Sequence, residues 1–317
     1  MRVLVTGASG FVGATLVEYF SKITDVSVVA MVRSTRDVRV NANIEFRVAE
    51  ICSAGEISIF LDDIDVVVHA AGRAHIMKEN SSDPLKEFRR VNTVGTLNLA
   101  KQAAISGVKR FIFISTVKVL GEKTEPGQSF KSDDPFNPQD PYSISKVEAE
   151  IGLNLIGESH GIGIVIIRPP LLYGQGVKGN FASLLKLARL PIPLPFGAIA
   201  NKRSLVSVEN LADLIVVCFN HPMARNQTFL VSDDDDMSTP VLFSRLAEAG
   251  DCKAYMFRFP LILIAISLVL LGKRGIYERL CGSMQVNIDY TKSRLRWEPP
   301  FTVKNSLSRC WLLDSER

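Results

Sequence analysis

A glycine-rich segment at the start of the chain constrains the fold more than any other feature. Residues 3–5 form a short apolar run that is typical of a buried parallel strand, and residues 14–20 have the pattern of a helix. Between them, Gly7, Gly10 and Gly13 recur at regular intervals. Glycine is needed where a Cβ would block a phosphate or hold a helix away from a strand, and a helix N-terminus attracts anions. This context predicts that a dinucleotide binds at the turn.

Further apolar runs of strand length alternate with helical stretches along the first half of the chain. These runs cover residues 26–32, 44–48, 65–69 and 111–115. A long helix is expected over residues 88–106, and a surface loop rich in Pro, Asp, Gly and Ser over residues 121–140. The alternation continues to about residue 168 and predicts an α/β fold with a doubly wound parallel sheet.

The composition limits the classes of function. With 317 residues the chain can form one large domain and a smaller lobe, and 47% apolar with 22% charged residues is ordinary for a globular enzyme. The net charge of +4 is spread along the chain, so nucleic-acid binding is not indicated. The five cysteines fit neither a zinc pattern nor a disulfide framework, which favours a reducing cytosol.

Three biased segments have simple interpretations. Glycines interrupt the apolar start of the chain, so no secretory signal is expected. The most apolar segment, residues 260–271, is shorter than the roughly 20 residues that cross a bilayer; a buried helix is favoured over docking to a membrane or a partner. The acidic run at 233–236 is better explained by a solvated turn than by a metal site. A cytoplasmic protein without a metal or an integral membrane segment is therefore expected.

The residues after the second expected strand predict the cofactor. An acidic residue at this position binds the ribose 2′-hydroxyl of NAD, whereas an arginine accommodates the 2′-phosphate of NADP. Arg33 and Arg36 stand here, with Ser34 and Thr35 between them as further donors. This favours NADP(H), while NAD(H) stays open, and the alternative interpretation is a solvated basic loop.

A tyrosine and a lysine at helical spacing suggest acid–base chemistry. Tyr142 and Lys146 are four residues apart, so they project from one face of a helix. A tyrosine titrates near 10, and an adjacent ammonium group should lower its pKa towards neutrality. A hydroxyl at the end of the fifth strand, Ser115 or Thr116, would hydrogen-bond the substrate oxygen.

Small residues follow the fourth expected strand. Ala70, Ala71 and Gly72 would let the backbone approach a flat ligand closely. His69 and His75 lie on either side of them. We interpret His69 as a structural residue at the strand end and His75 as part of a loop over the active site.

Together these motifs resemble the extended short-chain dehydrogenase/reductases, and among them the nucleotide-sugar epimerase/dehydratase family. The resemblance covers nearly the whole chain and includes the segments 115–121, 168–174 and 295–300, the last with Arg296 where glycine is usual. It implies a Rossmann domain over residues 1–168, to which residues 205–232 return. It also implies a smaller C-terminal α/β lobe, residues 169–204 and 233–317, that binds a UDP-sugar, and a homodimer through helices at 88–106 and 143–160.

The resemblance also implies roles for individual residues. The catalytic residues would be Thr116, Tyr142 and Lys146. Those contacting the cofactor would be Gly7, Ser9, Gly10, Phe11, Val12, Arg33, Arg36, Glu50, Ile51, Ala70, Ala71, Gly72, Asn92, Ser115, Tyr142, Lys146, Pro169 and Leu172. Those contacting the UDP-sugar would be Arg73, His75, Thr116, Asn180, Phe181, Pro195, Phe196, Arg203 and Arg279, with Arg203 as a diphosphate ligand.

The two residues after Thr116 narrow the reaction. Dehydratases of the family carry an Asp-Glu pair there, whereas this chain has Val117 and Lys118, so dehydration is not expected. Extra bases for epimerisation at C3 or C5 are not evident either. Hydride transfer at C4 of a UDP-sugar remains, as a net reduction or as the oxidation step of a 4-epimerase.

Two features favour reduction. The arginines after the second strand suggest an exchangeable NADPH, and residues 271–283 resemble bacterial O-antigen enzymes. Those enzymes reduce a UDP-2-acetamido-2,6-dideoxy-4-hexulose to UDP-N-acetylquinovosamine for surface polysaccharide. Three alternatives stay open: a UDP-glucose or UDP-N-acetylglucosamine 4-epimerase with retained NAD, a reductase of a small non-nucleotide carbonyl similar to dihydroflavonol reductases, and a non-catalytic NADP-binding sensor.

Overall fold

A parallel sheet forms the centre of the computed structural model, which describes residues 1–34, 44–51, 61–74, 83–177, 179–270 and 274–311. Within these residues the sheet has seven strands in the order β10-β6-β5-β4-β1-β2-β3, all parallel to their neighbours. The strands are β1 (Arg2–Thr6), β2 (Ser27–Val32), β3 (Glu45–Val48), β4 (Val66–His69), β5 (Arg110–Ile114), β6 (Gly163–Arg168) and β10 (Gln227–Leu230). The predicted doubly wound sheet is confirmed, and the four later apolar runs correspond to β2 through β5.

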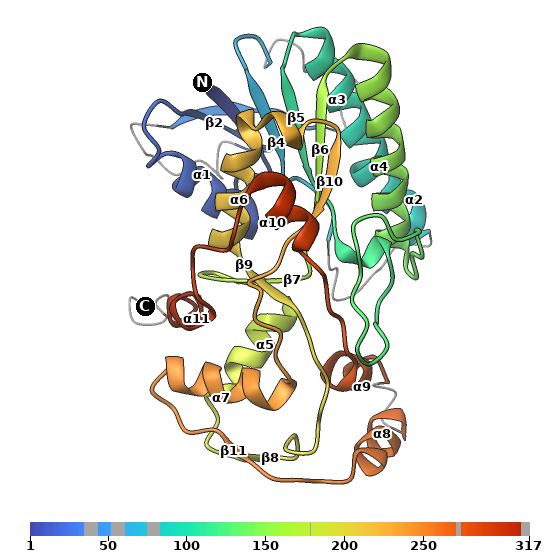
Figure 1. Ribbon diagram of the computed structural model, residues 1–317, viewed down its shortest axis with the longest axis vertical. Coiled ribbons are helices and arrows are strands. Elements are labelled where there is room, and N and C mark those ends of the chain that lie inside the picture. Colours follow the sequence, from blue (N-terminus) through green and yellow to red (C-terminus); the bar gives the residue numbers. More distant parts are fainter. Residues whose placement is uncertain (35–43, 52–60, 75–82, 178, 271–273, 312–317) are drawn as a thin grey trace.

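Helices cover both faces of this sheet (Figure 1). α1 (Phe11–Phe20) and α6 (Val208–Asn220) pack on one face, and α3 (Thr96–Ile105) and α4 (Pro141–His160) pack on the other. Strands β4, β5 and β6 are buried along their whole length. Parallel strands buried on both faces read as continuous apolar runs, which is why the sequence locates them well.

The helix expected over residues 88–106 consists of three pieces. α2 (Pro84–Phe88) leads into a π-helical turn, η3 (Arg89–Gly95), which continues into α3. π-Helical turns are rare and often lie at functional sites. This turn carries Asn92, whose side chain is buried.

Local sequence determines where α4 begins. Asp140 is the N-cap residue: its carboxylate accepts the Ser143 N–H at 2.6 Å, and the Ser143 hydroxyl accepts the Asp140 N–H at 3.1 Å. Pro141 occupies the first turn, where its missing N–H breaks no helical hydrogen bond. Tyr142 therefore lies at the start of the helix, with Lys146 one turn later.

A second, smaller lobe has its own core, built on aromatic residues that include Tyr173, Phe181 and Phe196. Its strands form two short parallel pairs, β7 (Leu171–Tyr173) with β9 (Leu205–Ser207) and β8 (Pro193–Leu194) with β11 (Tyr255–Met256). Its helices are α5 (Gly179–Ala188), α7 (Thr239–Ala249), α8 (Leu261–Leu270), α9 (Arg274–Cys281) and α11 (Val303–Arg309). Figure 1 shows this lobe below the sheet.

Part of the C-terminal segment differs from the expected division of the chain. Met284, Val286, Leu295 and Trp297 belong to the core beside the large sheet, although residues 233–317 are expected in the second lobe. α10 (Asp289–Leu295) lies in this segment and binds β10, because the Thr291 hydroxyl donates to the Leu230 carbonyl at 2.6 Å. The segment therefore returns to the sheet.

The expectation of a buried helix at residues 260–271 is wrong. α8 covers most of this segment, but Ile262 is 69% exposed and Leu270 is 81% exposed. Only one side of the helix packs on the lobe, through residues such as Ile264. No helix in the described ranges is both long and apolar enough to cross a membrane.

Arg296, where the resemblance noted in the sequence implies a glycine, adopts a left-handed backbone conformation after α10, with φ of 49°. The other non-glycine residues with positive φ in the described chain are Asp or Asn, which tolerate this region. A long side chain at such a helix end is strained, whereas glycine is not.

Replacing Arg296 with glycine is expected to raise the free energy of unfolding by about 0.5–1 kcal/mol, because the relieved strain exceeds the added entropy of the unfolded chain. Urea unfolding at 25 °C measures the change. Arg296→Ala is the matched control, since it removes the side chain but keeps the strained Cβ. Equal stability of the two variants would contradict the assignment of strain.

Candidate active site

The glycine turn after β1 has the geometry that close approach requires. Gly7 has φ of 68°, and a Cβ on it would lie 2.7 Å from the Ala71 nitrogen. A Cβ on Gly13 would lie 2.1 Å from the Gly7 carbonyl oxygen. Gly10 is the N-cap residue of α1, and its N–H donates to the Gly7 carbonyl at 2.9 Å. Side chains at these positions would therefore push α1 away from the strand ends.

This turn lies where dinucleotides bind in such sheets. The chain passes from β1 to β2 on one side and later returns to place β4 on the other side of β1. Ligands of doubly wound folds bind outside the carboxyl ends of the strands at this reversal. The first N–H groups of α1 have no partner within the helix, so they are available to a pyrophosphate. Phe11 and Val12 begin this helix, and the exposed Ser9 and Gly10 precede them.

The carboxyl end of β4 is held by a buried hydrogen-bonded histidine. The His69 ring contacts the Thr6 hydroxyl through Nδ1 at 2.7 Å and the Thr96 hydroxyl through Nε2 at 2.9 Å. The Ala71 N–H donates to the same Thr6 hydroxyl at 3.2 Å. Burial lowers the pKa of His69 to about 3, so the ring is neutral. These contacts agree with the structural role predicted for His69.

Asn92 joins the loop after β4 to α4. Its side-chain oxygen accepts the Arg73 N–H at 2.7 Å, and its amide donates to the Arg73 carbonyl at 3.0 Å and to the Ser145 hydroxyl at 3.0 Å. A Cβ on Gly72 would lie 3.3 Å from Asn92 Oδ1 and 3.7 Å from Lys146 Nζ. Asn92 thus positions the loop beside Lys146, whereas the sequence predicted a cofactor contact.

Lys146 is almost fully buried between the sheet and the loop. Its Nζ donates to the Ile114 carbonyl at 2.9 Å and lies 4.3 Å from the centre of the Phe113 ring. Burial lowers the pKa of Lys146 to about 7. The lysine therefore changes charge near neutral pH, as groups at functional sites often do.

The predicted direction of the Tyr142 pKa shift is wrong. Burial and the negative charge of Asp140 raise this pKa above its usual value near 10. Lys146 does not oppose the shift, because its own charge is weakened by burial and its ammonium group donates to Ile114. Tyr142 packs edge-on against Phe88, with ring centres 6.0 Å apart. The phenol of this structure is protonated at neutral pH.

An ion pair connects the segment of Thr116 to the start of α4. The Thr116 hydroxyl accepts the Lys118 N–H at 3.3 Å at the start of a short 3-10 helix, η4 (Val117–Val119). Lys118 Nζ contacts Asp140 at 2.5 Å and Glu122 at 2.7 Å. Thr116 follows β5, and Asp140 caps the helix that carries Tyr142. Lys118 therefore links the segment of Thr116 to the start of the helix of Tyr142.

Ser115, which the sequence predicts as a cofactor contact, takes part in a buried hydrogen-bond network. Its hydroxyl donates to Glu150 at 2.5 Å, and Glu150 also forms a buried ion pair with Arg168, with Nη2 and Oε2 2.6 Å apart. Glu150 is not among the residues that the sequence predicted for the site. Its spacing of four residues from Lys146, on the same face of α4, was the available signal.

The other predicted cofactor positions lie around the strand ends, but Arg36 and His75 are outside the described residues. Arg33 follows β2, is exposed and forms no ion pair with any described residue. Glu50 is exposed and Ile51 is buried just beyond β3. Ala70 follows β4, Pro169 follows β6 and Leu172 lies in β7. The Pro169 carbonyl accepts the Val117 N–H at 3.0 Å.

Arg203 is an unpaired cation in the second lobe. Its Nη1 donates to the carbonyls of Arg279 at 3.1 Å and Gly282 at 3.0 Å, and no carboxylate among the described residues pairs with it. Burial without a counter-charge lowers the pKa of Arg203. Arg279 itself is exposed on α9. Arg203 therefore contacts the last turn of α9, the helix that carries Arg279, through its backbone carbonyls.

Two predicted substrate residues have packing roles instead. Phe181 is 1% exposed and stacks on Tyr173, and Phe196 is buried against Phe243. The geometry of these two side chains gives no support to the predicted contacts with a UDP-sugar. The sequence could not distinguish the two roles, because aromatic residues can have the same spacing in a core and in a ligand site. Pro195 is partly exposed beside β8, and Asn180 lies in α5. Arg73 packs over the Phe88 ring.

The acidic run is not a solvated turn throughout. Asp233 is buried and accepts hydrogen bonds from the Tyr173 hydroxyl at 2.6 Å, the Asn210 amide at 2.6 Å and the Ser207 N–H at 2.9 Å. Among the described residues, no group of three or more His, Cys, Asp or Glu side chains is arranged to hold a metal ion.

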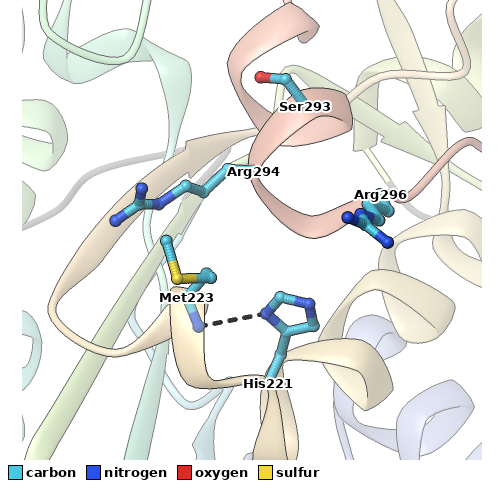
Figure 2. A pocket seen from close by; sticks show the side chains of 5 residues that line it. All are labelled: His221, Met223, Ser293, Arg294 and Arg296. Carbon is cyan, nitrogen blue, oxygen red and sulfur yellow. Dashed lines mark hydrogen bonds between the residues drawn. The ribbon is translucent and has the colours of Figure 1, made fainter.

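A cavity of about 400 Å³ lies away from this site. Figure 2 shows the residues that line it, which are His221, Met223, Ser293, Arg294 and Arg296. His221 follows α6, and its carbonyl accepts a hydrogen bond from Arg110 at the start of β5. The cavity therefore lies at the amino-terminal ends of the strands, whereas the glycine turn lies at their carboxyl ends.

Comparisons with known proteins agree with this geometry. A UDP-glucose 4-epimerase from Vibrio cholerae is 46% identical over 308 residues, which cover 97% of this chain and 93% of that protein. The structure of a UDP-glucuronic acid 4-epimerase from Bacillus cereus in complex with NAD matches with a TM-score of 0.79 at 20% identity, covering 100% of this chain and 99% of that chain. A UDP-glucose 4-epimerase from Thermotoga maritima with UDP-glucose matches with a TM-score of 0.78 at 19% identity, covering 100% of both chains.

At such identities the structural matches show the fold alone, which is that of the extended short-chain dehydrogenase/reductases. A family model supplies the classification. It is described as the NAD dependent epimerase/dehydratase family and matches residues 3–231, well over half of the chain. The chain belongs to the NAD-dependent epimerase/dehydratase family.

Proposed function

We propose that the protein is an enzyme that transfers hydride at C4 of a UDP-sugar. The observation that carries this proposal is the arrangement of Thr116, Tyr142 and Lys146 beside the glycine turn. Lys118 and Asp140 tie the first two together, and Lys146 lies next to Gly72. A non-catalytic sensor would not need an acid–base pair buried beside its nucleotide turn.

The strand ends fit a nicotinamide dinucleotide. The turn at Gly7 and Gly10 would hold the pyrophosphate, Arg33 would face the adenosine ribose, and Lys146 the nicotinamide ribose. The nicotinamide ring supplies or accepts the hydride when the cofactor is bound.

The chain's own residues manage the proton. Because Tyr142 holds its proton at neutral pH, it is ready to donate this proton to the C4 oxygen of a keto sugar. Thr116 can donate its hydroxyl hydrogen to the same oxygen, because in its hydrogen bond with Lys118 the hydroxyl is the acceptor. Lys146, with a pKa of about 7, can return a proton towards Tyr142 after each turnover.

We favour net reduction of a 4-keto UDP-sugar in surface polysaccharide synthesis, with NADPH as the reductant and the cytoplasm as the location. Arg33 and the protonated Tyr142 both support this direction. The second candidate is a 4-epimerase with a retained cofactor, which is supported by the 46% identity to the Vibrio cholerae UDP-glucose 4-epimerase.

The cofactor released from the purified, denatured protein separates these candidates. Mass spectrometry and absorbance should find an empty site that then binds NADPH tightly, and the protein should oxidise NADPH when a 4-keto UDP-sugar is added. Stoichiometric NAD and interconversion of UDP-glucose with UDP-galactose would instead establish the epimerase. Turnover of a small carbonyl compound without inhibition by UDP would refute the proposal that the substrate is a UDP-sugar.

Arg203 provides a test of the UDP site. Arg203→Met should weaken the binding of UDP roughly 10- to 100-fold, because a charge-assisted hydrogen bond to the diphosphate is lost. Calorimetric titration with UDP measures the change. The control is Lys202→Met: Lys202 is exposed, and its backbone N–H, which the substitution retains, donates to Ser283. Unchanged UDP affinity in the Arg203 variant would remove Arg203 from the site.

We also propose a homodimer through α3 and α4. Val94, Ile105, Ile151 and Leu155, on η3 and on these two helices, are exposed apolar residues, with exposed fractions from 48% to 68%. Exposed apolar groups on neighbouring helices favour a helix-to-helix contact between two copies. Analytical ultracentrifugation tests this proposal.

A further inference from the structure

We propose that the end of the second lobe formed around α8 docks on an anionic phospholipid surface. This inference goes beyond the proposed function and does not depend on it. It begins from the apolar side chains that α8 leaves exposed.

Exposed apolar residues concentrate at this end of the molecule. Of the eighteen large hydrophobic residues exposed in the described chain, nine lie within residues 190–192 and 255–270. We call these nine the apolar tip: Leu190, Ile192, Tyr255, Phe257, Ile262, Leu263, Ile266, Val269 and Leu270. β8 and β11 pair with each other, and Figure 1 shows them at the same end of the lobe as α8. A concentration of exposed apolar residues at one end of a protein favours an interaction site there.

The exposed residues of α8 form one face. Ile262, Ile266 and Val269 follow one another at helical spacing, and Leu263 and Leu270 lie beside them. Ile264, on the opposite side, is buried against the lobe. This face holds no charged side chain, so its exposure to water is unfavourable.

The charged residues that flank α8 in the sequence are all positive. Between Asp251 and Glu278 the chain has no acidic residue, and its four charged residues are Lys253, Arg258, Lys273 and Arg274. Lys253 and Arg258 are exposed and pair with no carboxylate in the described residues. Basic residues beside an exposed apolar surface add electrostatic attraction to anionic headgroups to the burial of the apolar groups.

This charge pattern favours a lipid surface over a second copy of the chain. A twofold contact between two apolar tips would bring the same cations together, which is unfavourable. An anionic phospholipid surface offers both an apolar layer for α8 and negative headgroups for the flanking cations. The ten residues of α8 rise about 15 Å, roughly half of the hydrocarbon core, so the helix would lie along the surface.

Vesicle flotation of the full-length protein tests the proposal. The protein should float with vesicles of phosphatidylcholine and phosphatidylglycerol, and much less with phosphatidylcholine alone. The double variant Ile262→Glu/Ile266→Glu should bind at least about tenfold more weakly, because two exposed apolar contacts are lost and two anions are added. Lys253→Glu/Arg258→Glu should weaken binding similarly, and high salt should weaken the wild-type protein's binding.

Val241→Glu is the matched control, because Val241 is an exposed apolar residue on α7 outside the apolar tip. It should float like the wild type, and all variants should retain the wild-type circular dichroism. Absence of flotation with anionic vesicles, or equal flotation of the Ile262→Glu/Ile266→Glu variant, would overturn the proposal. A change of oligomeric mass in that variant without vesicle binding would assign the apolar tip to a second copy and also overturn it.

Discussion

Replacing Tyr142 with phenylalanine is expected to lower turnover by roughly 10²- to 10⁴-fold, the usual contribution of a positioned acid or base. The substitution removes one oxygen and keeps the ring that packs against Phe88. NADPH binding should therefore change little. Stopped-flow measurement of hydride transfer and fluorescence titration with NADPH measure the two effects separately.

Tyr290→Phe is the matched control, because Tyr290 lies on α10 and its hydroxyl bonds to Gln227 at the start of β10 rather than to the site. This variant should keep wild-type turnover. Wild-type turnover in the Tyr142 variant, or an equal loss in both variants, would refute the role of Tyr142.

The pKa values of the two active-site residues show why the sequence predicted the pair but not its electrostatics. The spacing of Tyr142 and Lys146 places them on one face of α4, as expected. Burial, however, depends on the loop after β4 and on the ring of Phe113, which are distant in the sequence. Burial disfavours both the ammonium and the phenolate. It therefore lowers the pKa of Lys146 to about 7 and raises the pKa of Tyr142 above its usual value near 10.

The fold was predictable where one local pattern has one structural meaning. The apolar runs of β2 and β5 and the glycines before α1 are such patterns. Asp233 and α8 show the opposite case. An acidic run is normally solvated, but Asp233 is buried because Tyr173 and Asn210, from other segments, donate hydrogen bonds to it. An apolar helix is normally buried, but α8 is exposed because too little of the chain covers it.

Loss of the Glu150 side chain is expected to destabilise the fold strongly. Its carboxylate is 1% exposed and accepts hydrogen bonds from Arg168 and Ser115. Arg168 also donates to the Ser132 carbonyl at 2.9 Å, so the pair joins α4, β5 and β6 to the loop at residues 121–140. Glu150→Ala leaves a buried guanidinium without its counter-charge, which should cost about 3–5 kcal/mol of unfolding free energy.

Urea unfolding at 25 °C measures this loss, with Glu148→Ala as the control on the same helix. Glu148 pairs with Arg89 at the same distance of 2.6 Å, but both side chains are substantially exposed, so its loss should cost less than about 1 kcal/mol.

The double variant Glu150→Leu/Arg168→Met distinguishes the cost of leaving one buried charge unpaired from the net stabilisation by the ion pair itself. Removing both partners leaves neither charge unpaired, so the double variant should be more stable than Glu150→Ala. Equal losses from Glu150→Ala and Glu148→Ala would show that water reaches Arg168. A double variant less stable than Glu150→Ala would show instead that the ion pair itself stabilises the fold, beyond its desolvation cost.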